Sequence, residues 1–176
     1  LAANERLIVA LDVDTLKKAE HFAKLLYPTV KLFKIGSQLF TAYGSEAVKT
    51  VGKRGAKIFL DLKFHDIPNT VQGACYSSTG SGDYVNFVSY VTAQFRADQI
   101  VKSAVQYPVF MMTVHAAAGV EVLQNAVKGA TERAEELHIP RPLIVGVTVL
   151  TSENLGAGTL EEVLKRARNA KEAELD

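Results

Sequence analysis

Five short apolar runs, separated by stretches with helical spacing, constrain the fold of this chain more than any other feature. The runs cover residues 7–11, 30–35, 57–62, 110–114 and 143–149. Near-continuous apolar runs of this length are typical of strands covered on both faces, as in a parallel sheet. Helices are predicted over residues 16–26, 45–55, 122–137 and from 159 onward, with Ser45 as an N-cap and Thr159 and Glu162 as a capping box. Alternating strands and helices predict an α/β fold of repeated βαβ units.

Polar side chains mark the carboxyl end of every predicted strand. They are Asp12, Lys34, Asp61, Lys63, His115 and Thr151. In a (β/α)8 TIM barrel this end of the sheet is the active-site face. A doubly wound open sheet would also bind its ligand at the strand ends, but a single switch point would need only some of these residues. The pattern therefore favours the barrel.

The length of the chain does not fit a whole barrel. Eight βα units need roughly 250 residues, with about 200 near the lower limit, and an open barrel exposes unpaired strand edges. We therefore expect residues 1–176 to form a single barrel domain that is incomplete, with about the first five βα units and the C-terminal units missing. Residues 76–98 are expected to be an insertion. Residues 75–83 look like a loop, and 84–95 fit either a helix or a strand.

Composition and charge argue against several classes of protein. The formal net charge of +1 gives no reason to expect nucleic acid or an anionic membrane as a partner. No apolar run approaches the length of a membrane span, and the first residues have no signal-peptide pattern. The single cysteine, Cys75, excludes an internal disulfide and is expected to be a packing residue. A cytoplasmic protein is therefore expected.

Asp61 and Lys63 form the centre of a candidate catalytic site. Side chains alternate along a strand, so these two residues are expected on one face. Lys34 and Asp12, at the ends of neighbouring strands, can join them in one charged network. Carboxylates beside an ammonium group favour its charged form, which leaves it ready to protonate a developing carbanion. The alternative is a structural ion-pair network, but four such residues on three strand ends favour a site.

Residues 61–70, Asp-Leu-Lys-Phe-His-Asp-Ile-Pro-Asn-Thr, resemble the Asp-x-Lys-x-x-Asp-Ile-x-x-Thr signature of the orotidine 5′-phosphate decarboxylase family. The similarity extends to residues 10–12, 33–36, 113–117 and 147–152, and so covers most of the chain apart from about 76–98. The resemblance implies decarboxylation of orotidine 5′-monophosphate to uridine 5′-monophosphate, a step of pyrimidine nucleotide synthesis. It also implies that neither a metal nor an organic cofactor is used.

The resemblance also implies roles for individual residues. Lys63 would protonate C6 of the pyrimidine after carbon dioxide leaves, and Asp61 would lie beside the substrate carboxylate. Asp12 and Lys34 would bind the ribose hydroxyls and complete the charge network, with Lys34 counted among the catalytic residues. The other implied substrate-binding residues are Ile67, Thr70 and Thr151, of which Thr151 would meet the pyrimidine.

In this family the residues that correspond to Asp66 and Thr70 reach into the neighbouring subunit's site, with Asp66 counted among the catalytic residues. A homodimer with shared active sites is therefore implied. The residues alone leave other interpretations open: Asp66 could be the N-cap of the next helix. His65 is expected to be a loop or packing residue, and His115 a hydrogen-bonded structural histidine.

Two alternative functions remain. Magnesium-dependent sugar-phosphate decarboxylases and aldolases share Asp-x-Lys-x-x-Asp, although the continuation Asp-Ile-Pro-Asn-Thr resembles the orotidine enzyme instead. A truncated barrel could also be a non-catalytic binding or assembly module. The family grips the substrate phosphate with residues on later strands that have no counterpart here. Since remote phosphate contacts help to organise the reacting end of a substrate, we expect these 176 residues alone to have little or no activity.

Overall fold

The computed structural model describes residues 6–53, 55–80, 109–153 and 155–176, which divide into two compact units. Of the described residues, 6–53, 55–61, 79–80 and 109–110 belong to the first unit, and 62–78, 111–153 and 155–176 belong to the second. Strand β3 (Lys57–Phe64) contributes its first residues to the first unit and its last residues to the second.

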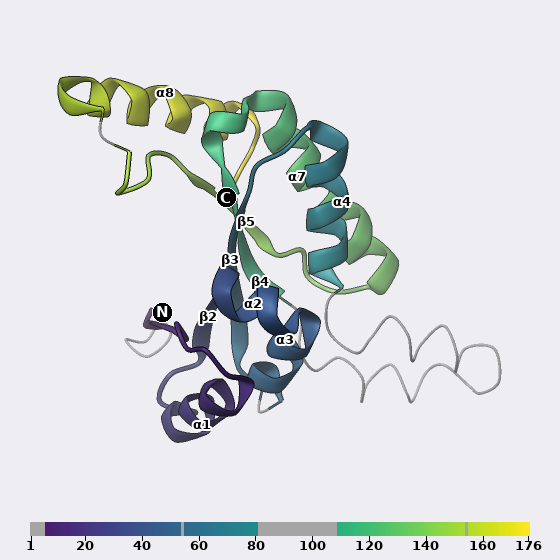
Figure 1. Ribbon diagram of the computed structural model, residues 1–176. Coiled ribbons are helices and arrows are strands. Elements are labelled where there is room, and N and C mark those ends of the chain that lie inside the picture. Colours follow the sequence, from purple (N-terminus) through teal and green to yellow (C-terminus); the bar gives the residue numbers. More distant parts are fainter. Residues whose placement is uncertain (1–5, 54, 81–108, 154) are drawn as a thin grey trace. The chain divides into compact units, whose positions relative to one another are not determined.

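Each of the five predicted apolar runs overlaps a strand (Figure 1). The other four strands are β1 (Ile8–Ala10), β2 (Leu32–Gly36), β4 (Val109–His115) and β5 (Leu143–Val147). The strand order is β1-β2-β3-β4-β5. The pairs β1–β2, β2–β3 and β4–β5 are all parallel. The prediction of a parallel α/β fold is therefore confirmed.

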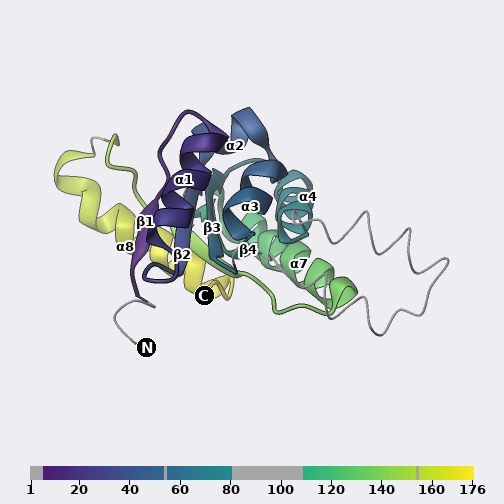
Figure 2. The ribbon, with the colours of Figure 1, turned by 90° about the horizontal axis from the view of Figure 1, so that it is seen from below.

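The described part of the first unit contains three helices. They are α1 (Leu16–Leu26), α2 (Ser37–Tyr43) and α3 (Ser45–Gly52). The hydroxyl of Thr15 accepts a hydrogen bond from the Lys18 N–H at the start of α1 (3.3 Å), and α1 packs beside α3 (Figure 2). The predicted Ser45 cap is wrong, because Gly44 occupies the N-cap with a φ of 54° and makes no side-chain cap bond. The short helix α2 was not predicted.

Alternation along β2 and β3 separates a fully buried apolar face from the face that carries Lys34 and Asp61 in the first unit. Phe33 and Ile35 of β2, with Ile58 and Leu60 of β3, are all fully buried. The residues between them on the two strands point the other way. The apolar core on one face of these strands therefore fixes which polar side chains meet on the opposite face.

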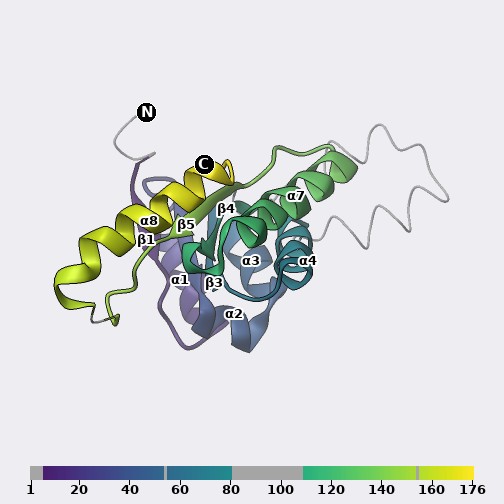
Figure 3. The same cartoon turned by 90° about the horizontal axis from the view of Figure 1, so that it is seen from above.

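The second unit contains α4 (Pro68–Thr79), α7 (Val120–Leu137) and α8 (Thr159–Glu172). Helices α4 and α7 lie side by side (Figure 3). The Gln72 amide donates to the Glu132 carboxylate at 3.0 Å, and the Tyr76 hydroxyl donates to Glu136 at 2.6 Å. Among the helices in the described ranges, none has the length and apolar character needed to cross a bilayer.

Residues 75–79 belong to α4, so the predicted loop over 75–83 is wrong for this part. The reason is tertiary packing: Cys75 is fully buried and Tyr76 is bonded to α7. Burial raises the pKa of the Cys75 thiol to about 12, as fits a packing residue. The rest of the predicted insertion, residues 81–98, lies outside the described residues, so the insertion stays a prediction.

The predicted capping box at the start of α8 is also wrong. Thr159 is the first residue of the helix rather than its cap, and its hydroxyl donates to the Gly156 carbonyl at 2.8 Å. Glu162 does not close a box, because its carboxylate accepts a hydrogen bond from Arg166 at 2.7 Å. The helix therefore starts without a side-chain cap at Gly158.

Candidate active site

The register of the first three strands brings Asp12, Lys34 and Asp61 together. Lys34 pairs with Ala10 of β1 and with Phe59 of β3, so these positions share one face of the sheet. Asp12 and Asp61 each lie two residues further along their own strand direction, which returns both side chains to that face. Three of the four residues predicted to form the charged network therefore converge within the first unit.

Lys34 lies between the two carboxylates. Its Nζ is 3.3 Å from Oδ1 of Asp12 and 3.4 Å from Oδ2 of Asp61. The side chain of Asp61 is 13% exposed, whereas that of Asp12 is 65% exposed, so the cluster opens to solvent at Asp12. Gly36 also lies beside Asp12, since a Cβ added to Gly36 would be 3.5 Å from Oδ1 of Asp12. An ammonium and two carboxylates are thus available to bind hydroxyl groups at an open edge.

Lys63 has an unusual backbone conformation. Its φ is 51°, in the left-handed region that side-chain-bearing residues rarely adopt. Its N–H donates to Oγ1 of Thr113 on β4 at 2.9 Å, and Thr113 is buried. The prediction that Lys63 shares a face with Asp61 assumed an extended backbone, so alternation alone does not fix the direction of the Lys63 side chain, and the shared face stays a prediction. Such strain costs about 1–3 kcal/mol and is typical of functional sites.

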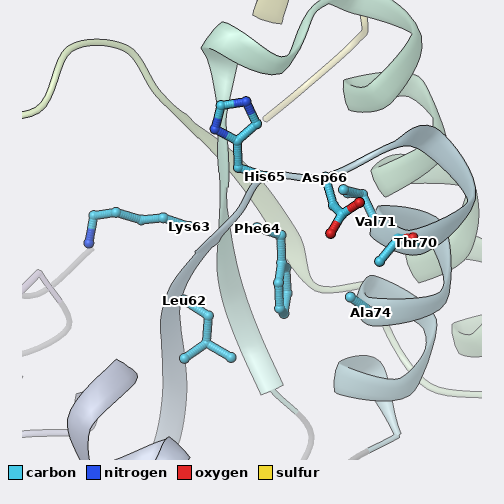
Figure 4. Close-up of a pocket in the computed structure, with 8 residues that line it drawn as sticks. All are labelled: Leu62, Lys63, Phe64, His65, Asp66, Thr70, Val71 and Ala74. Carbon is cyan, nitrogen blue, oxygen red and sulfur yellow. The ribbon is translucent and has the colours of Figure 1, made fainter.

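A shallow pocket in the second unit is lined by Lys63, Asp66 and Thr70, together with His65 and apolar neighbours (Figure 4). Figure 4 shows the Lys63 ammonium extending away from Asp66 and Thr70. Asp66 and Thr70 are exposed, and Ile67 between them is 66% exposed. The pocket therefore includes three predicted site residues without bringing the lysine amine to the other two.

Asp66 is not the N-cap of α4. Its carboxylate accepts a hydrogen bond from the N–H of Ile67 at 2.7 Å, and Ile67 directly precedes Pro68, the first residue of the helix. The carbonyl of Ile67 accepts the first-turn N–H groups of Thr70 and Val71. The N-cap alternative is therefore wrong, and the exposed Asp66 carboxylate faces the start of α4.

His115 lies at the end of β4 and is 8% exposed. Its Nδ1 accepts a hydrogen bond from the Ala117 N–H at 3.3 Å, which confirms a hydrogen-bonded histidine. His65, in the loop after β3, stacks on it with ring centroids 4.9 Å apart, as a packing role predicts. Burial lowers the pKa of His115, and the neighbouring His65 and Arg166 lower it further.

Thr151 lies beyond the end of β5 and is exposed. Its segment is held by two residues that the sequence did not single out as site residues, Glu153 and Arg166. Oε1 of Glu153 accepts the Leu150 N–H at 3.0 Å, and Arg166 donates to the same carboxylate at 3.1 Å. Both bonds lower the pKa of Glu153, that from Leu150 most. Opposite charges thirteen residues apart carry no recognisable motif, so the sequence offered no signal for this pair.

Metal binding has no candidate among the residues that the structure describes, since no three His, Cys, Asp or Glu side chains there group as metal ligands would. The described ranges do bring together two sets of predicted site residues. Asp12, Lys34 and Asp61 form one set, in the first unit. Lys63, Asp66 and Thr70 line one pocket in the second unit.

Comparison with known proteins gives consistent results. The sequence model of the "Orotidine 5'-phosphate decarboxylase / HUMPS family" matches residues 5–97. The orotidine 5′-phosphate decarboxylase of Moorella thermoacetica is 38% identical over 183 residues, covering 99% of this chain and 62% of the relative. The chain therefore spans less than two thirds of that relative's length.

Two solved structures are also similar. A crystal structure of an uncharacterized conserved protein from Geobacillus kaustophilus has a TM-score of 0.76 and 28% identity, covering 96% of this chain and 70% of the other. A crystal structure of orotidine 5′-phosphate decarboxylase from Lactobacillus acidophilus has a TM-score of 0.66 and 28% identity, covering 98% and 69%. These likenesses support the barrel class of α/β fold, with this chain matching part of it.

Proposed function

Because this chain belongs to the orotidine 5′-phosphate decarboxylase / HUMPS family, we propose that it carries the reacting end of an active site that decarboxylates orotidine 5′-monophosphate. The product is uridine 5′-monophosphate, so the enzyme is a carboxy-lyase of pyrimidine nucleotide synthesis. One observation carries the proposal: the Lys34 ammonium lies between the carboxylates of Asp12 and Asp61. Asp61 and Lys63 are two residues apart on the same strand, β3. In the same proposal the enzyme is a single-domain barrel protein of the cytoplasm.

The proposed chemistry is a proton transfer that completes a bond cleavage. The bond between C6 and the carboxylate carbon breaks, carbon dioxide leaves, and the electron pair remains on C6. The ammonium of Lys63 gives one proton to C6, as a general acid. The left-handed backbone at Lys63, held by the bond to Thr113, supports this role, since strained backbone is concentrated where side chains must be aimed.

The other residues bind and orient the substrate in this proposal. Asp61 lies beside the departing carboxylate. Because the Asp61 side chain is little exposed, the repulsion between the two carboxylates is less screened by water. Asp12 and Lys34 bind the ribose hydroxyls. The Asp12 carboxylate can accept and the Lys34 ammonium can donate hydrogen bonds, and the exposed Asp12 is accessible to a substrate. The remaining proposed substrate contacts are Ile67, Thr70 and Thr151.

Decarboxylation of orotidine 5′-monophosphate is the direct test. The natural protein that carries these 176 residues should consume the substrate, which can be monitored as a loss of the substrate's absorbance. The rate should be the same in excess EDTA. A magnesium-dependent sugar-phosphate enzyme of the same family would be inactive on this substrate and would lose its own activity in EDTA. Absence of turnover in fresh, folded protein would refute the proposal.

A homodimer with shared sites is part of the proposal, with Asp66 and Thr70 entering the neighbouring subunit's site. The exposure of Asp66, Ile67 and Thr70 at the start of α4 supports it. Co-expressing Lys63→Ala with Asp66→Asn should restore activity that neither variant has alone. Random pairing leaves roughly one site in four intact, because half of the dimers are hybrids with one native site. If the mixture stays as inactive as its components, the sites are not shared.

A further inference from the structure

The carboxylate of Glu153 is the hub of a small network behind Thr151. Its Oε1 accepts the N–H of Leu150 at 3.0 Å, and its Oε2 lies 3.0 Å from Nη1 of Arg166. Nε2 of His115 lies 3.8 Å from Oε1. The Leu150 and Glu153 backbones are also joined, by a bond from the Glu153 N–H to the Leu150 carbonyl at 2.9 Å. Thr151 therefore lies inside a closed turn whose two ends are bonded to each other.

Arg166 ties this turn to helix α8. Its Nη1 donates both to Glu153 and to the backbone carbonyl of Thr148, and its Nε donates to Glu162 at 2.7 Å. The guanidinium thus contacts residues on both sides of Thr151. The Arg166 side chain is only 11% exposed, so these charge-assisted bonds are less screened than those of a surface arginine.

His115 closes the other side of the network as a neutral group. Since Nδ1 accepts the Ala117 N–H, the ring proton is on Nε2, which faces Glu153. Burial, the His65 ring, Arg166 and Lys63 all lower the pKa of His115, and only Glu153 raises it. Arg166 is therefore left as the cation that pairs with Glu153 within the described part of this unit.

We propose that Glu153 and Arg166 are positioning residues, which hold residues 148–153 in one conformation so that Thr151 is presented to the pyrimidine. This inference rests on the proposed function, because Thr151 is a substrate contact only there. No contact of Glu153 or Arg166 with substrate is invoked. Both act through the backbone of the turn, by bonds to Thr148 and Leu150. An exposed threonine on an unanchored loop would lose this orientation to conformational freedom.

The test compares Glu153→Gln and Arg166→Gln with Arg168→Gln in the natural protein that carries this chain. Arg168 is an exposed arginine on the same helix, so its substitution makes the same change in charge as Arg166→Gln. Hydrogen exchange of the 148–153 amides, followed by mass spectrometry, should be faster in the first two variants and unchanged in the third. In Glu153→Gln and Arg166→Gln the affinity for uridine 5′-monophosphate should fall about three- to tenfold, which corresponds to the net free energy of one hydrogen bond.

A double-mutant cycle with Thr151→Ala separates positioning from a general structural effect. If Glu153 acts through Thr151, then Glu153→Gln should cause no further loss of nucleotide affinity in the Thr151→Ala background. An equal further loss, or unchanged hydrogen exchange in both variants, overturns the inference. If the native protein binds no uridine 5′-monophosphate, the proposed function fails, and the inferred role of Thr151 fails with it. Faster exchange would then still identify the network as an anchor of the turn.

Discussion

Lys63→Ala is expected to lower the turnover of orotidine 5′-monophosphate by at least about 10²–10⁴-fold, the usual contribution of a general acid. The variant removes the proposed proton donor to C6 while leaving Asp12, Lys34 and Asp61 in place. Nucleotide affinity should therefore change much less than the rate. Steady-state kinetics would measure the loss in kcat, and titration with uridine 5′-monophosphate would measure the retained binding.

Two further variants serve as controls for Lys63→Ala. Lys57→Ala removes a lysine at the opposite end of the same strand, where its Nζ lies 4.5 Å from the centre of the Phe110 ring, and should leave the rate unchanged. Lys63→Gly should be as inactive as Lys63→Ala but more stable by about 1–2 kcal/mol, because glycine adopts the left-handed φ of 51° without strain. Chemical denaturation would measure this difference. A Lys63→Ala enzyme that keeps most of its rate would show that another group is the acid.

The strands and the charged cluster of the first unit could be predicted from the sequence because one physical pattern determines both. The apolar runs require burial, and burial of Phe33, Ile35, Ile58 and Leu60 leaves the alternate positions for polar side chains. Lys34 then meets the two aspartates by register alone. Side chains alternate between the two faces of a strand whenever its backbone is extended. The local sequence is sufficient to predict an extended backbone.

The features that the sequence did not reveal depend on residues far apart in the chain. The left-handed conformation of Lys63 is not a local preference of lysine, and its N–H is bonded to Thr113, fifty residues further on. Residues 75–79 are rich in loop-forming serine and threonine, but packing against α7 makes them helical. In each case a tertiary contact outweighs the local signal.

Gly129→Ala is expected to destabilise the second unit by about 1–3 kcal/mol, through overpacking of two helices. Gly129 is buried on α7, and a Cβ there would overlap the backbone carbonyl oxygen of Gln72 and lie 2.9 Å from its carbonyl carbon. Backbone cannot rotate aside as a flexible side chain can, so α4 or α7 must shift. Thermal or chemical unfolding would measure the loss, at about 2–4 °C in Tm for each kcal/mol.

Gly73→Ala is the matched control, because Gly73 is exposed on α4 and, apart from its chain neighbours and the nearby backbone of α4 itself, no atom of the described residues lies within 4 Å of an added Cβ. This variant should gain about 0.4–1 kcal/mol, since alanine restricts the unfolded chain and favours a helix. The two alanines should therefore change stability in opposite directions. If Gly129→Ala were as stable as Gly73→Ala, α4 and α7 would not be in close contact at Gly129.

If the contact is right, a shift of α4 would also displace Thr70, which lies in the first turn of that helix. Nucleotide affinity should then fall together with stability in Gly129→Ala and not in Gly73→Ala.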